Sequence, residues 1–351
     1  MKRYVIVLVV ILSLIVQSCN DREKLETPSF NSSLVIDNEN WREDYYLGDE
    51  WEMKHIFLGE DFDGTPIATL IRSKESVNNN KAVLYIHGYS DYFYQASLAD
   101  SMELHGFRFY ALDLRRYGRS KLPDQIWYDL RDISDYYEEI DLAIKELRGE
   151  YPFAEITLMA HSTGGLIASL YAADRGDSLE VSSLILNSPF FDINVGGVTE
   201  SVGIPIISAL GSIFPRMVVN RKISPVNCLS LHSNYYGEWQ FDTIMKPIQS
   251  PMVTAAWIKA IHRGQQRLQE GIKINVPLLV MCSSKSSKGM KFEDIHKKSD
   301  TVLDVAEIVE FSSRISGPVK VVIIEDGIHD LVLSAKEPRD KAYREIFNFL
   351  R

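Results

Sequence analysis

The chain has 351 residues, 45% of them hydrophobic, so it is long enough to bury a large core in one big domain or two modest ones. Its formal net charge is −10. An acidic chain without a basic patch argues against nucleic acid as a partner. The sequence contains three cysteines and eight histidines, and none of their spacings is typical of a zinc site.

The N-terminus has the pattern of an export signal. Lys2 and Arg3 precede an almost wholly apolar run, residues 4–16, and the stretch "VQSC" then ends at Cys19. The apolar run is short for a membrane span, so residues 1–18 are predicted to be a signal peptide. The Val-Gln-Ser-Cys ending resembles a bacterial lipoprotein signal, which implies lipidation of Cys19 and anchoring to a bacterial membrane, facing the periplasm or the cell surface. Ordinary secretion and an uncleaved anchor are the alternatives.

Residues 19–45 are polar and are predicted to form a flexible tether between the lipid and a domain that begins at residue 46. The first strands are expected at residues 51–60 and 66–73, joined by a turn near Asp63-Gly64. They would form an antiparallel edge of the sheet.

Strands and helices then alternate. Strands are predicted at residues 81–86, 106–113, 156–160, 181–191, 276–284 and 318–325, and helices at 95–105, 133–148, 164–173, 302–311 and from 336 onward. This order is typical of the α/β class, with a mostly parallel sheet covered by helices on both faces.

Residues 191–270 interrupt this alternation and show no strand pattern. They are predicted to be a cap inserted into a core formed by residues 46–190 and 271–351. The stretch "VGIPIISALGSIF", residues 202–214, is apolar enough for a lid helix. Five aromatic side chains of the cap would either line a pocket or pack the cap against the sheet: Tyr235, Tyr236, Trp239, Phe241 and Trp257.

The stretch "ITLMAHSTGGLIASLYAA", residues 156–173, places a serine between a strand and a helix. A nucleophile at such a turn needs small residues two before and two after it, because the flanking backbones nearly touch. Ala160 and Gly164 meet this requirement around Ser162. The turn also directs the Thr163 N–H, at the helix N-terminus, toward the same space. An ordinary turn serine is the alternative.

A serine nucleophile needs a base, which follows it in the chain in folds with this kind of turn. Four histidines follow Ser162, and of these His329 lies in a short loop directly after a late strand. That position puts His329 at the same end of the sheet as the serine. His232 and His262 fall in the cap and are expected to be packing or surface residues.

The serine turn and the pair His87-Gly88 resemble serine hydrolases of the monoglyceride-lipase and serine-aminopeptidase group of the α/β-hydrolase superfamily. That group tends to carry Asp-x-x-x-Asp before a helix, with the first Asp in the catalytic triad. Asp300-Thr-Val-Leu-Asp304 matches this pattern. The resemblance therefore implies Asp300 as the acid and Asp304 as the alternative, although Asp304 would also suit a helix cap. The remaining candidates are Asp192, Glu293 and Asp294.

The resemblance also implies an oxyanion hole formed by the backbone N–H groups of Tyr89 and Thr163. His87 would order the loop that carries Tyr89, and His161 would pack beside the nucleophile. The stretch "DLRRYGRS", residues 113–120, resembles a loop of the same group and is interpreted as structural. Of the cysteines, Cys282 lies in an apolar strand pattern that favours a buried free thiol, although a disulfide with Cys228 would suit an exported protein.

These residues together predict a serine hydrolase that acts on carboxylic esters without a metal or cofactor. The apolar cap and the Cys19 anchor favour acylglycerol or lysophospholipid-like substrates. Peptidase or thioesterase activity on the same triad is the alternative, since a fold does not select among them. A non-catalytic binding protein on the same scaffold is a further alternative, which predicts that no carboxylate reaches His329.

Overall fold

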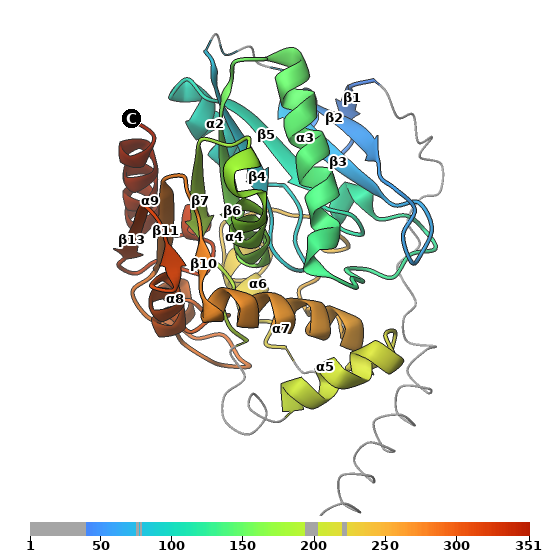
Figure 1. Cartoon of the computed structure of the whole chain (residues 1–351). Coiled ribbons are helices and arrows are strands. Elements are labelled where there is room, and N and C mark those ends of the chain that lie inside the picture. The colour runs from blue at the N-terminus through green and yellow to red at the C-terminus, as the bar shows by residue number, and fades with distance from the viewer. Residues whose placement is uncertain (1–39, 75–76, 78, 194–202, 220–222) are drawn as a thin grey trace, which may run out of the picture.

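The computed structural model describes residues 40–74, 77, 79–193, 203–219 and 223–351, and a nine-stranded sheet forms its centre (Figure 1). The strand order is β1-β2-β3-β5-β4-β6-β7-β11-β13. The bounds of these strands are β1 Arg42–Asp44, β2 Gly48–Phe57, β3 Ile67–Ser73, β4 Lys81–Ile86, β5 Arg108–Asp113, β6 Glu155–His161, β7 Ser183–Asn187, β11 Leu278–Ser283 and β13 Val319–Ile324.

The six strands from β5 to β13 in this order pair in parallel, whereas β1, β2 and β3 form an antiparallel edge. Both features match the sequence prediction, and the α/β class with a mostly parallel sheet is confirmed. Because the carboxyl ends of parallel strands meet at one edge, the loops after β4, β6, β11 and β13 converge there. That edge carries the predicted site residues.

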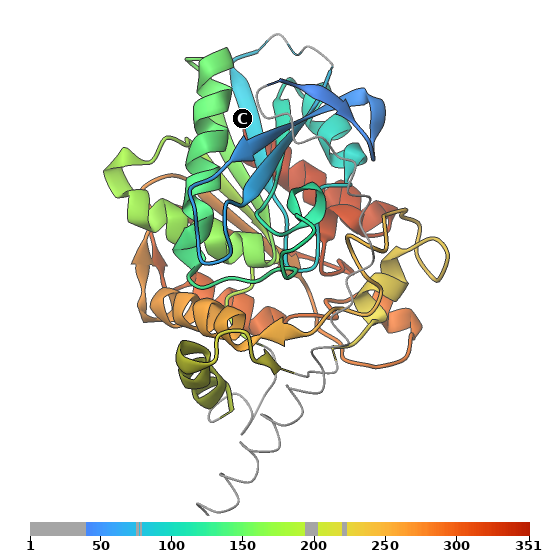
Figure 2. The ribbon, with the colours of Figure 1, turned by 90° about the vertical axis from the view of Figure 1, so that its right-hand side faces the viewer.

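Helices cover both faces of the sheet, as Figure 2 shows from the side. Helices α3 (Tyr137–Glu150) and α4 (Thr163–Arg175) lie on one face, and α2 (Ala96–Leu104) and α9 (Lys336–Phe349) lie on the other. Alternate residues of β4 follow this division. Leu84 belongs to the apolar core under α3 and α4, and Tyr85 belongs to the core under α2 and α9. With both faces buried, the central strands read as continuous apolar runs.

The predicted insertion contains three described helices: α5 (Ile204–Ile213), α6 (Val226–Leu231) and α7 (Ala255–Glu270). Helix α5 packs on α7, and α7 packs on α4 of the core; Figure 1 shows α5 and α7 below the sheet. The sequence pattern gave no strand here, but β8 (Val218–Val219) and β9 (Val253–Thr254) pair as a short antiparallel ladder. Two residues a strand are too few to produce a readable alternation.

Short elements complete the described fold. They are the 3₁₀ helices Gly118–Ser120, Ile133–Tyr136, Gly176–Ser178, Asp294–Lys297 and Leu331–Leu333, the helix α8 (Val305–Ser312), and the parallel pair β10 (Ile272–Lys273) and β12 (Ile315–Ser316). No helix among the described residues combines the length and apolar character that crossing a membrane requires. The predicted signal peptide and Cys19 lie outside the described residues.

The tether predicted for residues 19–45 is too long at its C-terminal end, because β1 lies within it. Asp44 of β1 is fully buried and receives a hydrogen bond from Nε of the buried Arg119 at 2.7 Å. Arg119 also donates to Asp113 at 2.9 Å. The sequence pattern did not indicate this strand, because its residues are polar and Arg119, the buried partner of Asp44, is distant in the chain.

Candidate active site

Ser162 sits at the tight turn between β6 and α4, with backbone φ 54° and ψ −117°. A side chain at such a positive φ is strained, and the surrounding packing must hold it there. The two glycines beside it show how close the backbones lie. A Cβ on Gly164 would meet the His87 carbonyl oxygen at 2.5 Å, and a Cβ on Gly88 would meet Ser162 Cβ at 2.9 Å. The glycine that the motif predicts two residues after the serine is therefore sterically required.

The structure brings three distant residues into one hydrogen-bonded chain. Ser162 Oγ lies 3.0 Å from His329 Nε2, and His329 Nδ1 lies 2.8 Å from Asp300 Oδ2. All three side chains are buried. A carboxylate accepts only, so Nδ1–H donates to Asp300, and the unprotonated Nε2 is left to accept the hydroxyl proton of Ser162. This is the tautomer that a general base requires.

Asp300 is held by its own loop. Its Oδ1 accepts hydrogen bonds from the backbone N–H groups of Val302 and Leu303, each at 2.8 Å, which leaves Oδ2 for His329. The residues between β11 and Asp300 form an excursion that returns to the strand end, where Ser286 and Asp300 make an isolated bridge. The absence of a carboxylate directly after the strand is thus compensated by a chain that loops back.

The other acid candidates lie in different places. Asp304 is the N-cap of α8 and accepts from the Ala306 N–H at 2.9 Å. Glu293 caps the 3₁₀ helix at residues 294–297, Asp294 lies exposed within that helix, and Asp192 accepts from the N–H of its own neighbour, Ile193. Among the histidines, His232 bonds within the insertion to Asn234 N–H.

The loop after β4 carries Tyr89 and is ordered by His87, as predicted. His87 Nε2 accepts from the Leu114 N–H at 3.1 Å, so Nδ1 carries the proton and donates to the Gly88 carbonyl at 2.8 Å. Burial lowers the pKa of His87, which keeps this tautomer neutral. Tyr89 follows Gly88, which touches Ser162, and Thr163 is the first residue of α4. Both proposed oxyanion donors therefore neighbour the serine.

Two polar residues that the sequence analysis did not single out connect the serine turn to the histidine loop. The Asn187 carbonyl accepts from Ser162 N–H at 3.0 Å, and its side-chain amide donates to Asp330 Oδ1 at 2.7 Å. Asp330 directly follows His329 and also receives a bond from Gln95 at 3.2 Å. In the sequence, the feature that could have indicated this connecting role is an Asn at the end of an apolar strand.

The loop at residues 113–120 is structural, since its arginines are buried in ion pairs. Arg116 bonds to Asp61 at 2.7 Å, and Arg119 bonds to Asp44 and Asp113. The two described cysteines, Cys228 and Cys282, are buried free thiols rather than a disulfide. No group of acidic, His or Cys side chains in the described part of the chain is arranged to hold a metal ion.

The aromatic residues of the insertion divide between packing and exposure. Trp257 and Phe241 are buried, and the Trp257 ring lies 4.7 Å from the Tyr89 ring. Trp239 donates its indole N–H to the Leu333 carbonyl at 2.7 Å. Tyr235 and Tyr236 are half exposed at the surface. The packing interpretation therefore holds for Trp257, Phe241 and Trp239. Tyr236, although half exposed, stacks on Phe292 of the core at 3.8 Å between ring centroids.

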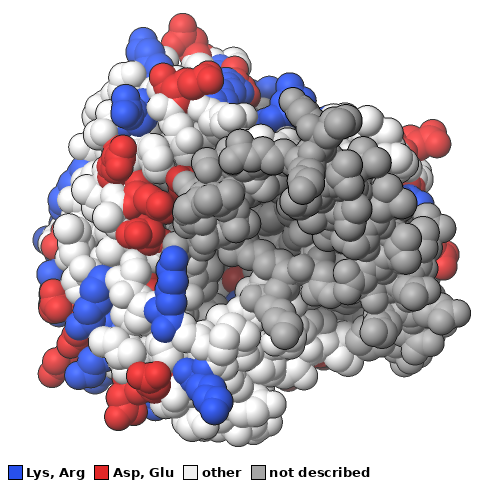
Figure 3. Space-filling view, turned by 90° about the horizontal axis from the view of Figure 1, so that it is seen from below, with Lys and Arg blue, Asp and Glu red and all other residues white. Residues whose placement is uncertain are grey.

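Helix α5 presents an apolar surface without any charged residue in the helix. Its exposed side chains include Ile206 at 39% and Ile213 at 69%, and Phe214 beside it is 49% exposed. Figure 3 views the molecule from below, the side on which α5 and α7 lie in Figure 1. In the part of that face that is not covered by grey atoms, charged side chains lie over the left half and along the upper edge (Figure 3).

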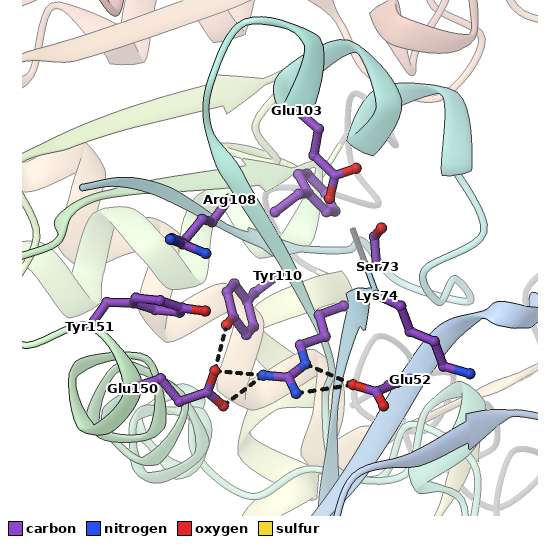
Figure 4. Close-up of a pocket in the computed structure, with 10 residues that line it drawn as sticks. Glu52, Ser73, Lys74, Glu103, Arg108, Tyr110, Glu150 and Tyr151 are labelled. Atoms are coloured by element: carbon purple, nitrogen blue, oxygen red, sulfur yellow. Dashed lines mark hydrogen bonds and ion pairs between the residues drawn. The ribbon is translucent and has the colours of Figure 1, made fainter. Parts of the chain in front are cut away.

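A pocket of about 410 Å³ lies at the opposite end of the sheet, near the start of β5. Arg72 donates hydrogen bonds to both Glu52 and Glu150, two of the lining residues that Figure 4 labels. Tyr110 donates to the same Glu150 at 3.2 Å. Arg72, Glu52 and Glu150 are thus paired with one another, and the pocket is separate from Ser162 at the carboxyl end of β6.

Comparison with known proteins agrees with this geometry. A family model described as serine aminopeptidase, S33, matches residues 78–335, well over half of the chain. Probable lysophospholipase BODYGUARD 1 of Arabidopsis thaliana is 25% identical over 190 residues, which cover 52% of this chain and 39% of that protein. Probable lysophospholipase BODYGUARD 2 of the same plant is 27% identical over 135 residues, covering 36% and 27%. The chain thus matches less than half the length of these curated relatives.

Solved structures show the same fold. A soluble variant of monoglyceride lipase from Saccharomyces cerevisiae has a TM-score of 0.61 and 14% identity, covering 91% of this chain and 99% of that one. The monoacylglycerol lipase of Paleococcus ferrophilus has a TM-score of 0.55 and 18% identity, covering 77% and 93%. The predicted fold and family are therefore confirmed: the chain has the α/β-hydrolase fold and belongs to the hydrolase family described as serine aminopeptidase, S33.

Proposed function

We propose that this protein is a serine hydrolase that cleaves carboxylic esters with Ser162, His329 and Asp300 as its catalytic triad. The observation that carries the proposal is the buried chain of 3.0 and 2.8 Å hydrogen bonds that joins these three side chains at a strained turn. Strain at a buried serine beside an oriented imidazole is typical of an activated nucleophile.

The reaction follows from the hydrogen-bond directions. Ser162 Oγ attacks the ester carbonyl carbon while His329 Nε2 takes its proton, and Asp300 stabilises the imidazolium that forms. The N–H groups of Tyr89 and Thr163 donate to the oxyanion, and each such donor contributes about 3 kcal/mol to the transition state. When the carbon–oxygen bond to the alcohol breaks, His329 returns the proton to that alcohol. Water then releases the acid from Ser162 by the same steps.

The proposed substrates are acylglycerols or lysophospholipid-like esters. The uncharged, exposed surface of α5 suits contact with a lipid. The curated relatives are described as probable lysophospholipases, and two of the similar solved structures are monoglyceride or monoacylglycerol lipases. Peptidase or thioesterase activity on the same residues predicts instead that aminoacyl amides or acyl thioesters are the faster substrates.

We further propose that residues 1–18 are removed as a signal peptide and that Cys19 is lipidated, which would hold the enzyme on the surface of a bacterial membrane. The support is the sequence pattern from Lys2 to Cys19. Expression of the full chain in a bacterium with an alkyne fatty acid tests this. We expect label in the membrane fraction for the parent chain and none for Cys19→Ser; equal labelling of both would reject lipidation at Cys19.

The activity is tested with residues 21–351 and a fluorescent fluorophosphonate. We expect the parent to be labelled and Ser162→Ala not to be. Ser169→Ala is the matched control, because Ser169 is also a buried serine of this turn and helix but bonds to the Gly165 carbonyl. Its labelling should equal that of the parent.

Substrate class is then read from hydrolysis of p-nitrophenyl esters of increasing acyl length, beside thioester and aminoacyl-amide analogues. Higher kcat/KM for the longer acyl esters supports the lipid substrate. Hydrolysis of short soluble esters alone would contradict it. A folded parent chain that neither labels nor hydrolyses any of these compounds would contradict the catalytic proposal itself.

A further inference from the structure

A buried ion pair connects the insertion to the loop that carries the proposed oxyanion donor. Lys246, from the insertion, places its Nζ 2.7 Å from Asp91 Oδ1, and both side chains are almost completely buried. Asp91 lies two residues after Tyr89 in the loop that follows β4. Lys246 also lies over the rings of Tyr94 and Phe241, at 5.4 and 5.8 Å from their centroids.

Other contacts join the same two segments. The Tyr89 hydroxyl donates to the Pro251 carbonyl at 3.4 Å, and the Asp242 N–H donates to the Tyr92 hydroxyl at 2.7 Å. The Tyr89 ring also packs on Trp257. Residues 89, 91 and 92 of the loop are therefore held by residues 242–257 of the insertion. The position of the Tyr89 backbone depends on the insertion as well as on β4.

The His161 ring lies between Asp91 and the proposed catalytic histidine, His329. Asp91 Oδ2 lies 3.5 Å from Nδ1 of His161, the residue before Ser162. The His161 ring centroid lies 4.8 Å from that of His329. The charged and titratable groups around this cluster are Asp91, Lys246, Asp330, Cys228, His87, His161, His329 and Asp300.

The charges of this cluster are coupled. Burial raises the pKa of Asp91, but Lys246, His161 and His87 together outweigh burial and hold this pKa well below its usual range. Burial likewise lowers the pKa of His161, but Asp330 and Asp91 outweigh it, so that this pKa is raised. A change in the Lys246–Asp91 pair therefore acts on the buried imidazole of His161, whose ring lies beside that of His329.

We propose that Lys246 is a positioning residue of the hydrolase: by pairing with Asp91 it holds the Tyr89 loop in the geometry of the oxyanion hole and sets the electrostatic field at His329. This inference rests on the proposed function. It means that the insertion positions a loop of the active site in addition to covering that site. It also predicts that the two charges act as a unit, so that removing both does less harm than removing either.

The test is a double-mutant cycle of Lys246→Met, Asp91→Asn and the two combined, with kcat/KM for a p-nitrophenyl ester measured against pH. Lys246→Met leaves a negative charge near His329, which favours the imidazolium and moves the acidic limb to higher pH. Asp91→Asn leaves a positive charge and moves that limb to lower pH. We expect each single variant to lose kcat/KM on the order of 10- to 100-fold, less than the loss of a whole oxyanion donor.

The combined variant should recover most of that loss and restore the parent's pH profile. Arg267→Met is the matched control, because Arg267 also joins the insertion to the core, through Asp174, but lies exposed on α7. Its profile should equal the parent's. Circular dichroism and thermal melts verify that each variant is folded. If a single variant unfolds, the combined variant, which has no unpaired buried charge, still tests the proposal through its kcat/KM and its pH profile.

The results separate this inference from the proposed function. Opposite shifts of the acidic limb in the two single variants, with recovery in the combined one, support the positioning role. Losses without a shift, or a combined variant worse than either single one, would show packing alone and overturn it. If the parent chain itself neither hydrolyses esters nor labels at Ser162, the proposed function fails instead.

Discussion

Asp300 and Asp304 both accept backbone hydrogen bonds, but only one of them faces His329. Asp300 uses Oδ1 for two backbone N–H groups and turns Oδ2 to the imidazole, and it is fully buried. Asp304 uses Oδ1 to cap α8. The two residues therefore have different roles, although they lie four positions apart in the same motif.

We predict that Asp300→Asn lowers kcat by about 10⁴-fold while the protein stays folded, because the amide no longer fixes the imidazole tautomer. Asp304→Ala should cost about 1 kcal/mol of unfolding free energy through loss of the helix cap, with kcat/KM close to that of the parent. Ester hydrolysis and urea unfolding of both variants measure this. Comparable activity in the two variants would contradict the assignment.

His55 is a buried histidine far from the serine turn, and it links pH to stability. Its Nδ1 lies 3.0 Å from Thr69 Oγ1, and Arg42 contacts its Nε2. Burial, and then the charge of Arg42, lower the pKa of His55 from 6.5 to about 4. The folded protein therefore keeps this ring neutral at pH values where the unfolded chain protonates it.

Unfolding consequently takes up a proton below the unfolded pKa of 6.5, so this contribution to stability falls as pH drops toward 4. Between about pH 7 and about pH 5, the parent should lose about 2 kcal/mol of unfolding free energy from this group. His55→Gln removes the titration and should not show that part of the loss. Urea melts of both proteins at the two pH values measure this difference. An equal decrease in unfolding free energy for the parent and for His55→Gln would contradict the role of His55.

The β6–α4 unit shows how an element is shaped by what lies beside it. The helix begins immediately after Ser162 and approaches the end of β4 so closely that Gly164 has no space for a Cβ. Gly149, near the end of α3, has nothing within 4 Å of the position of its Cβ. Both glycines are helical, and their surroundings differ.

Substitution of each glycine by alanine should therefore have opposite effects. Gly164→Ala forces the helix away from the His87 loop, and we expect a stability loss of about 1–3 kcal/mol with at least a tenfold loss of kcat/KM. Gly149→Ala should raise stability by up to about 1 kcal/mol, because alanine is the better helix former, and leave activity unchanged. Thermal melts and ester assays compare the two. A neutral Gly164→Ala would show that the turn has room to adjust.

At the scale of the whole molecule, the edge strand β1 and the buried Arg119 connect the start of the domain to its centre. Arg119 is fully buried and is paired with Asp44 of β1 and with Asp113 at the end of β5. Trp41 adds a stacking contact with Arg72, whose guanidinium lies 3.8 Å from its ring centroid. The domain boundary therefore lies before these residues.

A chain that begins at residue 46 should be less stable than one that begins at residue 40 by about 3 kcal/mol, because it leaves Arg119 without one of its buried partners. Asp44→Asn in the longer chain removes only the negative charge that pairs with Arg119, and this substitution should account for most of the difference in stability. Equal urea midpoints for the two chains would place the boundary after β1.

The sequence by itself determined the alternation of the core elements, the serine turn and the His329 loop. These features depend on local apolar periodicity and on the steric needs of a few neighbouring residues, which a chain displays in order. The chain order serine, acid, histidine, which is general for this kind of turn, guided the choice of candidates, and the family resemblance favoured Asp300 over Asp304.

Only the tertiary structure decided which carboxylate reaches His329, that β1 extends the sheet at Asp44, and that Lys246 pairs with Asp91. Each of these rests on polar or charged groups that are separated by tens to hundreds of residues in the chain and meet in a buried place. Their interaction is strong because water is excluded there. A linear pattern does not display such partners, because the burial that selects them arises only when the chain has folded.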